Sequence, residues 1–393
     1  MLTANPNQLL TSFQRQIGYI MLLTVLMLCV LGIVMLFSID GRFAPQSGAR
    51  ISNYAMLQLR FMLIGGTACI VFACIDYRVL LKYAPLAVGI AIFLMLLCFV
   101  PGIGRAAKGS PRWLTMGGFN LQPSEFAKIA LILFLSYWMS SRFVNSTSFL
   151  RGFVIPALIS GLVALPILKS EDLGTTVLLM LIFVCILFVA GTRPIYLAGL
   201  FVSVISGIFF VAINIPQRYA RLVAFLDPEE HKLGTGWQVL QALIALGSGG
   251  TTGVGLGMSR QKMDFLPECH TDFIFPIIGE EMGMIVTLCV VAAYLVFAIC
   301  GCWISVHAPD NGGFYLGMGI TCFITLQAMM NLFVVTSLMP NKGIALPFIS
   351  YGGSSLLFCL IAVGILFNLH RQGVAGGTDI GGVVLPERTS PRM

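Results

Sequence analysis

Residues 265–282, FLPECHTDFIFPIIGEEM, join a long polar segment to a long apolar one. This short stretch holds four of the chain's 16 acidic residues and one of its four histidines, namely Glu268, His270, Asp272, Glu280 and Glu281. Carboxylates at the mouth of an apolar helix cost free energy to hold there and usually mark a functional site. The stretch therefore predicts a membrane-spanning helix with a site at its entrance.

The composition of the whole chain agrees with a membrane protein. Of its 393 residues, 58% are hydrophobic and 10% are charged, whereas soluble domains carry about 25% charged residues. The net charge of +7 is spread over loops and ends without a long basic run, which argues against a nucleic-acid partner. The 11 cysteines indicate no disulfide framework and no paired metal-ligand spacing.

Ten apolar segments have a length of roughly 20 residues, which a helix needs to cross a bilayer. The predicted fold is therefore an all-α integral membrane protein with about ten transmembrane helices, in one domain over residues 17–370. An N-terminal tail, 1–16, precedes this domain, and a C-terminal tail, 371–393, follows it and is predicted to be disordered. The predicted spans are residues 17–38, 56–75, 83–101, 124–142, 152–168, 174–190, 194–214, 275–303, 313–338 and 352–370.

An even number of spans places both ends of the chain on the same side of the membrane. The loops and tails assigned inside hold nine Lys and Arg residues, against seven in the short outer loops, which favours cytoplasmic ends. Residues 265–282 then begin on the outer side. The positive charge of the outer loops needs a reason of its own.

The longest segment without a span, residues 215–271, is predicted to be a large extracytoplasmic loop. Within it, residues 237–246 repeat apolar side chains at helical spacing, with Gln238 and Gln241 off that face. This pattern is typical of a helix that lies in the membrane interface. The glycine-rich residues 247–257 follow no strand, so a nucleotide-binding loop is not indicated. Backbone that lies close to a substrate or to another helix is favoured.

Asp272 is the first candidate for chemistry. Pro276 fits the first turn of a helix, so Asp272 is expected at the helix mouth or just outside it. A carboxylate there can act as a general base on a hydroxyl or hold a divalent cation, and a helix-capping carboxylate is the equal alternative. Glu280 and Glu281 lie deeper by roughly 12–13 Å, and a buried pair that accepts hydrogen bonds from neighbouring helices is favoured for them.

A second cluster lies in QPSEFAKI, residues 122–129. Glu125 and Lys128 are three residues apart on one helix face and can form an ion pair. Burying such a pair at the end of a span costs free energy unless the pair is used. A structural ion pair and a substrate site are equal alternatives.

Two polar loops precede predicted spans. Residues 102–114, GIGRAAKGSPRWL, carry Arg105, Lys108 and Arg112, which suit a phosphate-bearing lipid headgroup or anchor the chain at the interface. In KSEDLGT, residues 169–175, a capped helix start is at least as well supported as a substrate contact through Asp172.

Residues 340–355, PNKGIALPFISYGGSS, hold two prolines and three glycines at the start of the last span. These residues predict non-helical backbone at membrane depth, which is tolerated where it lines a cavity. Lys342 and Ser350 can reach a phosphate there.

Taken together, HTDFIF, QPSEFAKI, PRWL, KGIALPFISYGGSS and LGSGGTTGVGLG resemble the SEDS family (shape, elongation, division and sporulation) over residues 17–372. The resemblance implies a ten-span peptidoglycan glycosyltransferase of the bacterial cytoplasmic membrane that polymerises lipid II, the lipid-linked disaccharide-peptide precursor. It also implies a class B penicillin-binding transpeptidase and other membrane proteins of the division machinery as partners. The lysine in PNKGIALPF is similar to the division branch, which builds the septal wall; an elongation-type polymerase is the alternative. The chain departs from the family at KSEDLGT, usually QPDLGT, and at Asn341, usually threonine.

Carried over by resemblance, the family's essential aspartate falls on Asp272, and its membrane-embedded acid–base pair falls on Glu125 and Lys128. The hypothesis is that Asp272 acts as the base or orients the acceptor hydroxyl. The lipid pyrophosphate would be held by cations of the outer loops, Arg105, Lys108 or Lys342, with Mg²⁺ or Mn²⁺ as the expected cation and no organic cofactor. A lipid II flippase and a scaffold that only docks a transpeptidase are the rivals.

Overall fold

The computed structural model describes residues 6–41, 54–107, 110–116, 119–214, 236–263, 265–340 and 342–377. In this part of the chain a helix occupies each of the ten predicted spans, which confirms the all-α class. These helices are α1 (Pro6–Asp40), α2 (Tyr54–Cys74), α4 (Ala84–Leu97), α5 (Pro123–Ser140), α6 (Ile155–Lys169), α7 (Leu173–Val189), α8 (Pro194–Asn214), α11 (Ile274–Val306), α12 (Asn311–Val335) and α13 (Gly353–Gly377). Shorter helical pieces are α3 (Tyr77–Lys82), the π-helical turn η1 (Leu150–Val154) and α10 (Trp237–Ser248).

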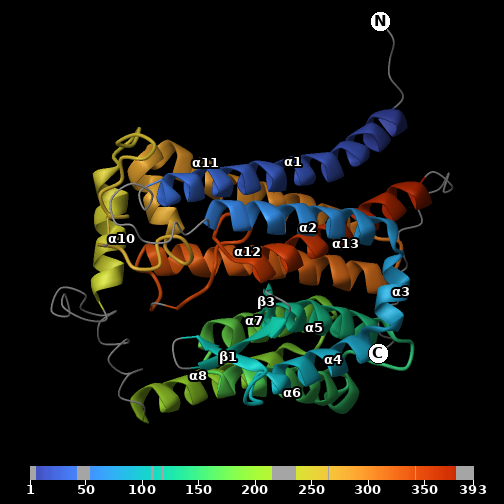
Figure 1. Cartoon of the computed structure of the whole chain (residues 1–393). Coiled ribbons are helices and arrows are strands. Elements are labelled where there is room, and N and C mark those ends of the chain that lie inside the picture. The colour runs from blue at the N-terminus through green and yellow to red at the C-terminus, as the bar shows by residue number, and fades with distance from the viewer. Residues whose placement is uncertain are drawn as a thin grey trace, which may run out of the picture.

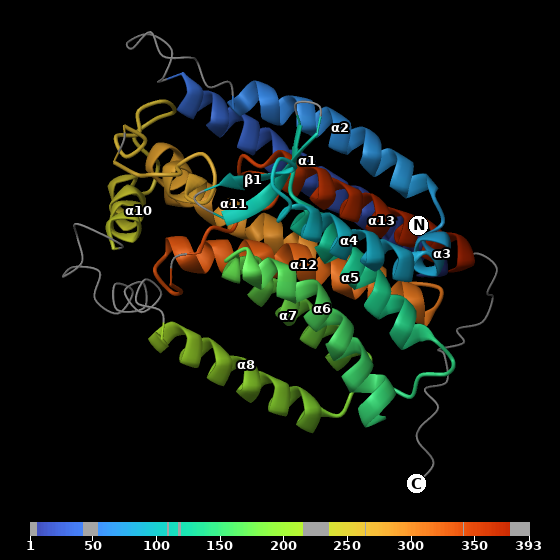
Figure 2. The same cartoon turned by 60° about the horizontal axis from the view of Figure 1, so that its bottom comes forward.

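The helices run side by side along one axis of the molecule (Figure 1). By length and composition, six of the described helices can cross a membrane, among them α1, α2 and α11 to α13. The start of α1 and the end of α13 lie at the same end of the bundle, and α10 lies at the opposite end (Figure 1). Packing is closest between α2 and α13 and between α11 and α12, while α5 joins this group to α4 and α7. Helix α8 lies at the edge of the bundle, next to α7 (Figure 2).

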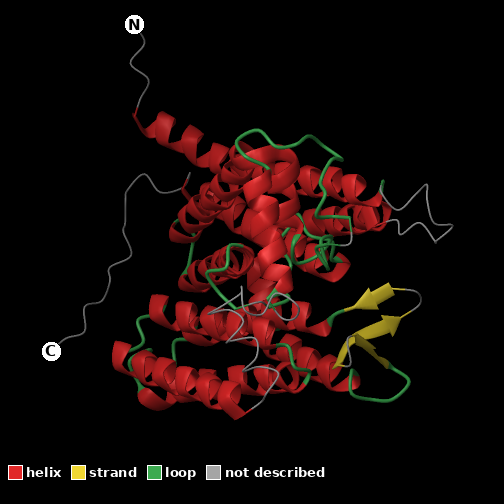
Figure 3. Ribbon diagram, turned by 90° about the vertical axis from the view of Figure 1, so that its left-hand side faces the viewer, coloured by secondary structure: helices red, strands yellow, loops and turns green. Residues whose placement is uncertain are grey.

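A small antiparallel sheet between α4 and α5 was not predicted. Its strands are β1 (Gly104–Ala107), β2 (Ser110–Met116) and β3 (Phe119–Leu121), in the order β1-β2-β3. The strands stand to one side of the helices (Figure 3), and Arg105 lies opposite Trp113 in the register. The sheet ends at Leu121, two residues before α5, so it fixes where α5 begins.

The first and last helices extend beyond the predicted spans. Helix α1 begins at Pro6, inside the predicted N-terminal tail, and α13 continues to Gly377, so residues 371–377 are helical. The last turns of α13 are held because Arg371 and Asn368 both donate to the carbonyl of Ala73. The rest of the C-terminal tail and residues 215–235 of the large loop lie outside the described residues.

The predicted helix in the large loop is α10, but its buried face differs from the predicted one. Val239, Ala242 and Ala245 are buried, whereas Leu243 and Ile244 are exposed. Residue Gln241, expected off the packed face, is also buried. Helix α10 packs against α11, so its buried face is set by a protein neighbour.

The glycine-rich segment packs directly on the backbone of α11. Close approach to another helix was one of the two alternatives predicted for it, and approach to a substrate was the other. The helix is interrupted at Gly283, where φ is 80° and ψ is −178°. There Val254 N donates to Glu280 O (2.9 Å) and Met284 N donates to Gly250 O (3.0 Å). A Cβ on Gly253 would lie 2.2 Å from Glu281 O, so only glycine permits this approach.

Candidate active site

Asp272 lies just outside α11, two residues before the helix begins at Ile274. Phe273 occupies the N-cap position of α11, so Asp272 directly precedes the cap residue. The backbone carbonyl of Asp272 accepts a hydrogen bond from Asn331 Nδ2 (2.8 Å). A Cβ on Gly343 would lie 2.9 Å from Asp272 Oδ2, so the carboxylate sits against Gly343. The partly exposed residue is thus placed beside the segment that follows α12.

That segment, residues 342–352, is non-helical, as predicted, and largely buried. It is joined to the residues before α11 by two hydrogen bonds: Ser350 Oγ donates to Thr271 O (2.6 Å), and Tyr351 N donates to His270 O (2.9 Å). Ser350 Oγ also accepts from Leu346 N (2.9 Å), and the residue is 4% exposed. The hydroxyl proton of Ser350 is thus donated to backbone in this structure, and the phosphate contact stays a prediction.

Lys342 begins this segment, next to Gly343. Burial lowers the pKa of its ammonium below that of an ordinary lysine. The side chain is only partly buried, so it can still face a ligand at the mouth of α11. Lys342 directly precedes Gly343, which lies against the Asp272 carboxylate, so it is a predicted cation beside the Asp272 region.

His270 is held by aromatic packing. Its ring stacks on Tyr54 of α2, with centroids 4.3 Å apart and 14° between the planes, and lies 6.0 Å from the Tyr351 ring. The structure therefore gives His270 a packing role beside Asp272. Glu268 accepts a hydrogen bond from Thr271 Oγ1 (3.0 Å), which shapes the same turn.

Glu125 and Lys128 form the predicted ion pair in the first turns of α5. The Lys128 Nζ to Glu125 Oε2 distance is 2.8 Å, and the side chains are 2% and 8% exposed for Lys128 and Glu125. No described group donates a well-aligned hydrogen bond to this Oε2. Lys128 Nζ also donates to Gln327 Oε1 of α12 (2.8 Å) and lies over the Phe323 ring. Gln327 Nε2 in turn donates to Ala345 O (3.0 Å), which links the ion pair to the segment beside Asp272.

Gln327 and Asn331 were missed from the sequence. The available signal was two amides four residues apart in an otherwise apolar helix, which places them on one face of α12. Both are buried and both bond to segments outside their own helix.

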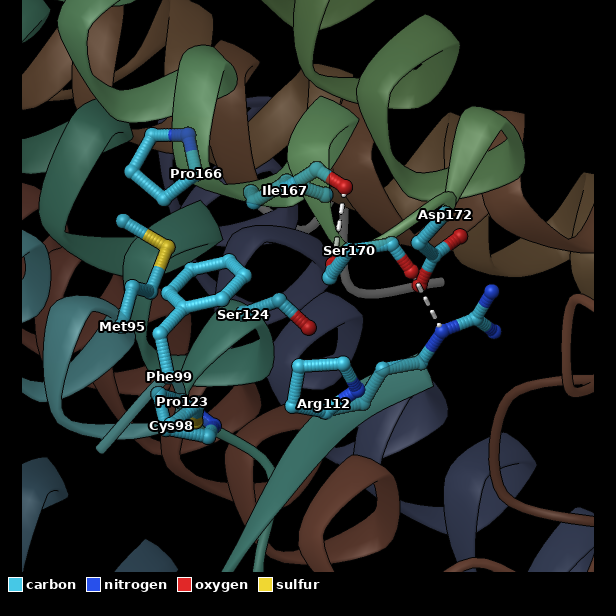
Figure 4. Close-up of a pocket in the computed structure, with 11 residues that line it drawn as sticks. Met95, Cys98, Phe99, Arg112, Pro123, Ser124, Pro166, Ile167, Ser170 and Asp172 are labelled. Carbon is cyan, nitrogen blue, oxygen red and sulfur yellow. Dashed lines mark hydrogen bonds between the residues drawn. The ribbon is translucent and has the colours of Figure 1, made fainter. Parts of the chain in front are cut away.

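The two described arginines of the sheet differ in whether they bond to the protein. Arg105 is exposed on β1, whereas Arg112 Nε donates to Ser170 O (2.9 Å). A small pocket lies at this junction, with Arg112 and Asp172 among its lining residues (Figure 4). Lys108 lies outside the described residues. Of the two that are described, Arg105 is thus the cation that the structure leaves on the surface.

Asp172 caps a helix. Its Oδ1 accepts from Thr175 N (3.0 Å) and its Oδ2 accepts from Thr175 Oγ1 (2.9 Å) at the start of α7. The side chain is buried. The capping alternative is therefore realised, and the substrate contact stays a prediction. The neighbouring Glu171 accepts from Ser110 Oγ of β2 (3.1 Å), so this turn also holds the sheet.

Glu280 and Glu281 are the buried pair that was favoured, but their partners are mainly in a loop. Glu280 accepts hydrogen bonds from Ser259 Oγ and from Arg260 N (2.9 Å). Glu281 forms an ion pair with Lys262 (2.7 Å) and accepts from Ser38 Oγ of α1 (2.6 Å). Both carboxylates thus fix residues 259–262 against α11 and α1. Lys262 was not singled out from the sequence.

A resident cation would have few ligands from the protein. In the described ranges no group of three or more His, Cys, Asp or Glu side chains converges. Mg²⁺ commonly binds through one or two carboxylates together with substrate phosphates and water. Asp272 fits such a site only as a single ligand that a substrate pyrophosphate completes, so the cation stays a prediction.

These observations define a class: a multi-pass helical membrane protein with a carboxylate and buried ionic groups gathered around the mouth of one helix. The chain belongs to the FtsW/RodA/SpoVE family, whose model, described as "Cell cycle protein", matches residues 19–374. The resemblance found in the sequence motifs is thereby confirmed.

Two relatives illustrate the similarity. The probable peptidoglycan glycosyltransferase FtsW of Geobacter metallireducens is 40% identical over 364 residues, which cover 92% of this chain and 96% of that protein. Stage V sporulation protein E of Bacillus subtilis is 39% identical over 355 residues, which cover 90% and 96% of the two chains.

Solved structures show the same fold. A chain from the structure described as "Structural coordination of polymerization and crosslinking by a peptidoglycan synthase complex" superposes with a TM-score of 0.74, at 24% identity and 90% coverage of this chain and 97% of that chain. The rod shape determining protein RodA of Thermus thermophilus gives a TM-score of 0.65, at 24% identity and 89% and 95% coverage.

Proposed function

We propose that this protein is a peptidoglycan glycosyltransferase that polymerises lipid II at the outer face of the bacterial cytoplasmic membrane, for septal wall synthesis. One observation carries the proposal: the Asp272 carboxylate lies beside Gly343, next to Lys342, at the mouth of α11. The similarity to a probable peptidoglycan glycosyltransferase over most of both chains supports the same activity.

The reaction needs a base more than it needs an acid. The acceptor hydroxyl oxygen attacks the anomeric carbon of the other sugar, and the bond from this carbon to the pyrophosphate oxygen breaks. Asp272 takes the hydroxyl proton. The lipid pyrophosphate leaves with its bonding electron pair as a stable anion, so it needs positive charge nearby rather than a proton donor.

The leaving group is met by cations of the same region. In this proposal Lys342 meets the pyrophosphate, and exposed Arg105 guides the headgroup toward it. A divalent cation, where bound, adds positive charge on the phosphates. The Glu125–Lys128 pair is connected to the 342–352 segment through the hydrogen bonds of Gln327, and in this proposal it influences the site by that route.

Partner and orientation complete the proposal. A class B penicillin-binding transpeptidase crosslinks the strands, which agrees with the coordination of polymerization and crosslinking described for the similar peptidoglycan synthase complex. The start of α1 and the end of α13 lie at the same end of the bundle, which supports our proposal that this end faces the cytoplasm (Figure 1). The lysine of PNKGIALPF favours the division branch over the elongation branch.

The activity is tested with purified full-length protein and lipid II, with and without a class B transpeptidase and with and without divalent cation. Gel separation of glycan strands is the readout. We expect strands in at least the partner-containing reaction. Translocation of lipid II across vesicles without any strands would favour the flippase. Depletion in cells separates the branches, since a division polymerase leaves undivided filaments and an elongation polymerase leaves rounded cells.

A further inference from the structure

Helix α12 carries two buried amides one turn apart, Gln327 and Asn331, each 1% exposed. A buried polar side chain in an apolar helix costs free energy unless it is hydrogen bonded, and inside a membrane protein it usually serves a function. Both side chains bond across helices instead of along α12, unlike Thr321, whose hydroxyl bonds to Gly317 O of the same helix. The two amides therefore connect separate parts of the molecule.

The chemistry of Lys128 fixes the orientation of Gln327. An ammonium has only donors, so the side-chain oxygen of Gln327 must face Lys128 Nζ, at 2.8 Å. The amide nitrogen must then point the other way, where it donates to Ala345 O (3.0 Å). The ammonium of Lys128 thus orients the Gln327 amide, and this orientation lets Gln327 donate to the 342–352 segment.

Asn331 hydrogen bonds both to the adjacent carbonyl of that segment and to the carbonyl of Asp272. Its Nδ2 donates to Ile344 O (2.7 Å) and to Asp272 O (2.8 Å). Carbonyl oxygens only accept hydrogen bonds, so the donating nitrogen of Asn331 must face both of them, and this amide also has one orientation. Its Oδ1 is buried and receives no hydrogen bond from the described residues. An unpaired buried oxygen is retained where the geometry it enforces is useful.

We propose that Gln327 and Asn331 are positioning residues that hold Asp272 in register with the Lys342–Ala345 backbone and make that register depend on the Glu125–Lys128 pair. The proposal rests on the proposed glycosyltransferase activity. Ile344 and Ala345 are consecutive, so the two amides donate hydrogen bonds to adjacent carbonyls of one segment. Asn331 also donates to the carbonyl of Asp272.

The test uses near-isosteric apolar variants of the full-length protein. We expect Asn331→Leu to lower kcat for lipid II polymerisation about 100-fold and Gln327→Met about 10-fold, with KM changed less than about threefold, because a small misplacement of a reacting group has this effect. The double variant should lose little more than Asn331→Leu alone, because both residues act on one segment. Hydrogen exchange of residues 342–350 should rise in each variant. Thr321→Val is the matched control, since it removes a buried hydroxyl of α12 whose bond stays within the helix.

Several results would overturn the proposal: wild-type kcat in Asn331→Leu, losses that multiply in the double variant, or the same loss in Thr321→Val. If Asn331→Leu does not fold, Asn331→Ser keeps a polar group that cannot donate to both carbonyls and should show the same fall in kcat. Failure of the wild-type protein to make strands would reject the proposed function. In that event the hydrogen-exchange comparison still decides the positioning role, and unchanged exchange of residues 342–350 rejects it.

Discussion

Two buried ion pairs of nearly the same length differ in how fully their carboxylates are bonded. In the Lys262–Glu281 pair the distance is 2.7 Å, and both Glu281 oxygens accept hydrogen bonds, from Ser38, from Ser259 N and from the lysine. In the Lys128–Glu125 pair the distance is 2.8 Å, and among the described residues the Lys128 ammonium is the partner of Glu125 Oε2. The Glu281 carboxylate is thus held by several donors, whereas Glu125 Oε2 relies on its lysine.

The difference separates structure from function. The Lys262–Glu281 pair holds residues 259–262 on α1 and α11. A buried carboxylate that relies on one cation is left as an uncompensated charge when that cation is removed. The Lys128–Glu125 pair leads through Gln327 to the segment beside Asp272. We therefore expect the first pair to serve the fold alone and the second to act on the Asp272 region as well.

The same substitution at both buried lysines tests this assignment. Lys262→Met leaves Glu281 buried without its cation, so the stability should fall by about 3–5 kcal/mol. Polymerisation per folded molecule should remain close to the wild-type value. Thermal unfolding in detergent together with the strand assay measures both, and the neutral pair Lys262→Met/Glu281→Gln should regain most of the stability.

Lys128→Met should act on the chemistry as well. We expect a loss of about 10-fold in polymerisation per folded molecule, as for Gln327→Met, because the Gln327 amide loses the contact that orients it. The neutral pair Lys128→Met/Glu125→Gln should regain stability without regaining activity. If this double variant regained both stability and activity, the two ion pairs would behave alike, which would contradict a separate role for the Lys128–Glu125 pair.

Lys342 provides a pH test on the catalytic side. Its pKa is lowered by burial, so its positive charge is lost at a lower pH than that of an ordinary lysine. Activity that needs this charge is present below the lowered pKa and falls as the pH rises through it. Lys342→Arg keeps the charge, so the alkaline fall should move to higher pH in the rate–pH profile. An unmoved fall would remove Lys342 from the pyrophosphate site.

The smallest effect is expected at Asp172, which belongs to the structural side. Asp172→Ala removes the cap of α7 and should lower stability by about 1 kcal/mol. The values of kcat and KM for lipid II should stay unchanged, because the carboxylate bonds to Thr175. A raised KM would restore the substrate contact that the sequence had suggested.

The sequence predicted what depends on local pattern. Helix lengths, α10, the place of Asp272 outside α11 and the Glu125–Lys128 pair follow from periodicity and spacing. The Lys262–Glu281 pair spans 19 residues and a loop, so only the tertiary fold reveals it. Ser350 was considered for a phosphate contact and Asp172 for a helix cap or a substrate contact, and such short polar side chains bond readily to nearby backbone. The short strands of the sheet have too few residues for a clear alternating pattern.

The most direct test of the account is strand synthesis by purified Asp272→Asn beside the wild-type protein. The variant keeps the shape of the side chain and loses the base. We predict that it folds, reaches the membrane and binds its transpeptidase, with an unfolding temperature like that of the wild type, but makes no glycan strands from lipid II. Strands made by Asp272→Asn at the wild-type rate would contradict the assignment of Asp272 as the catalytic carboxylate.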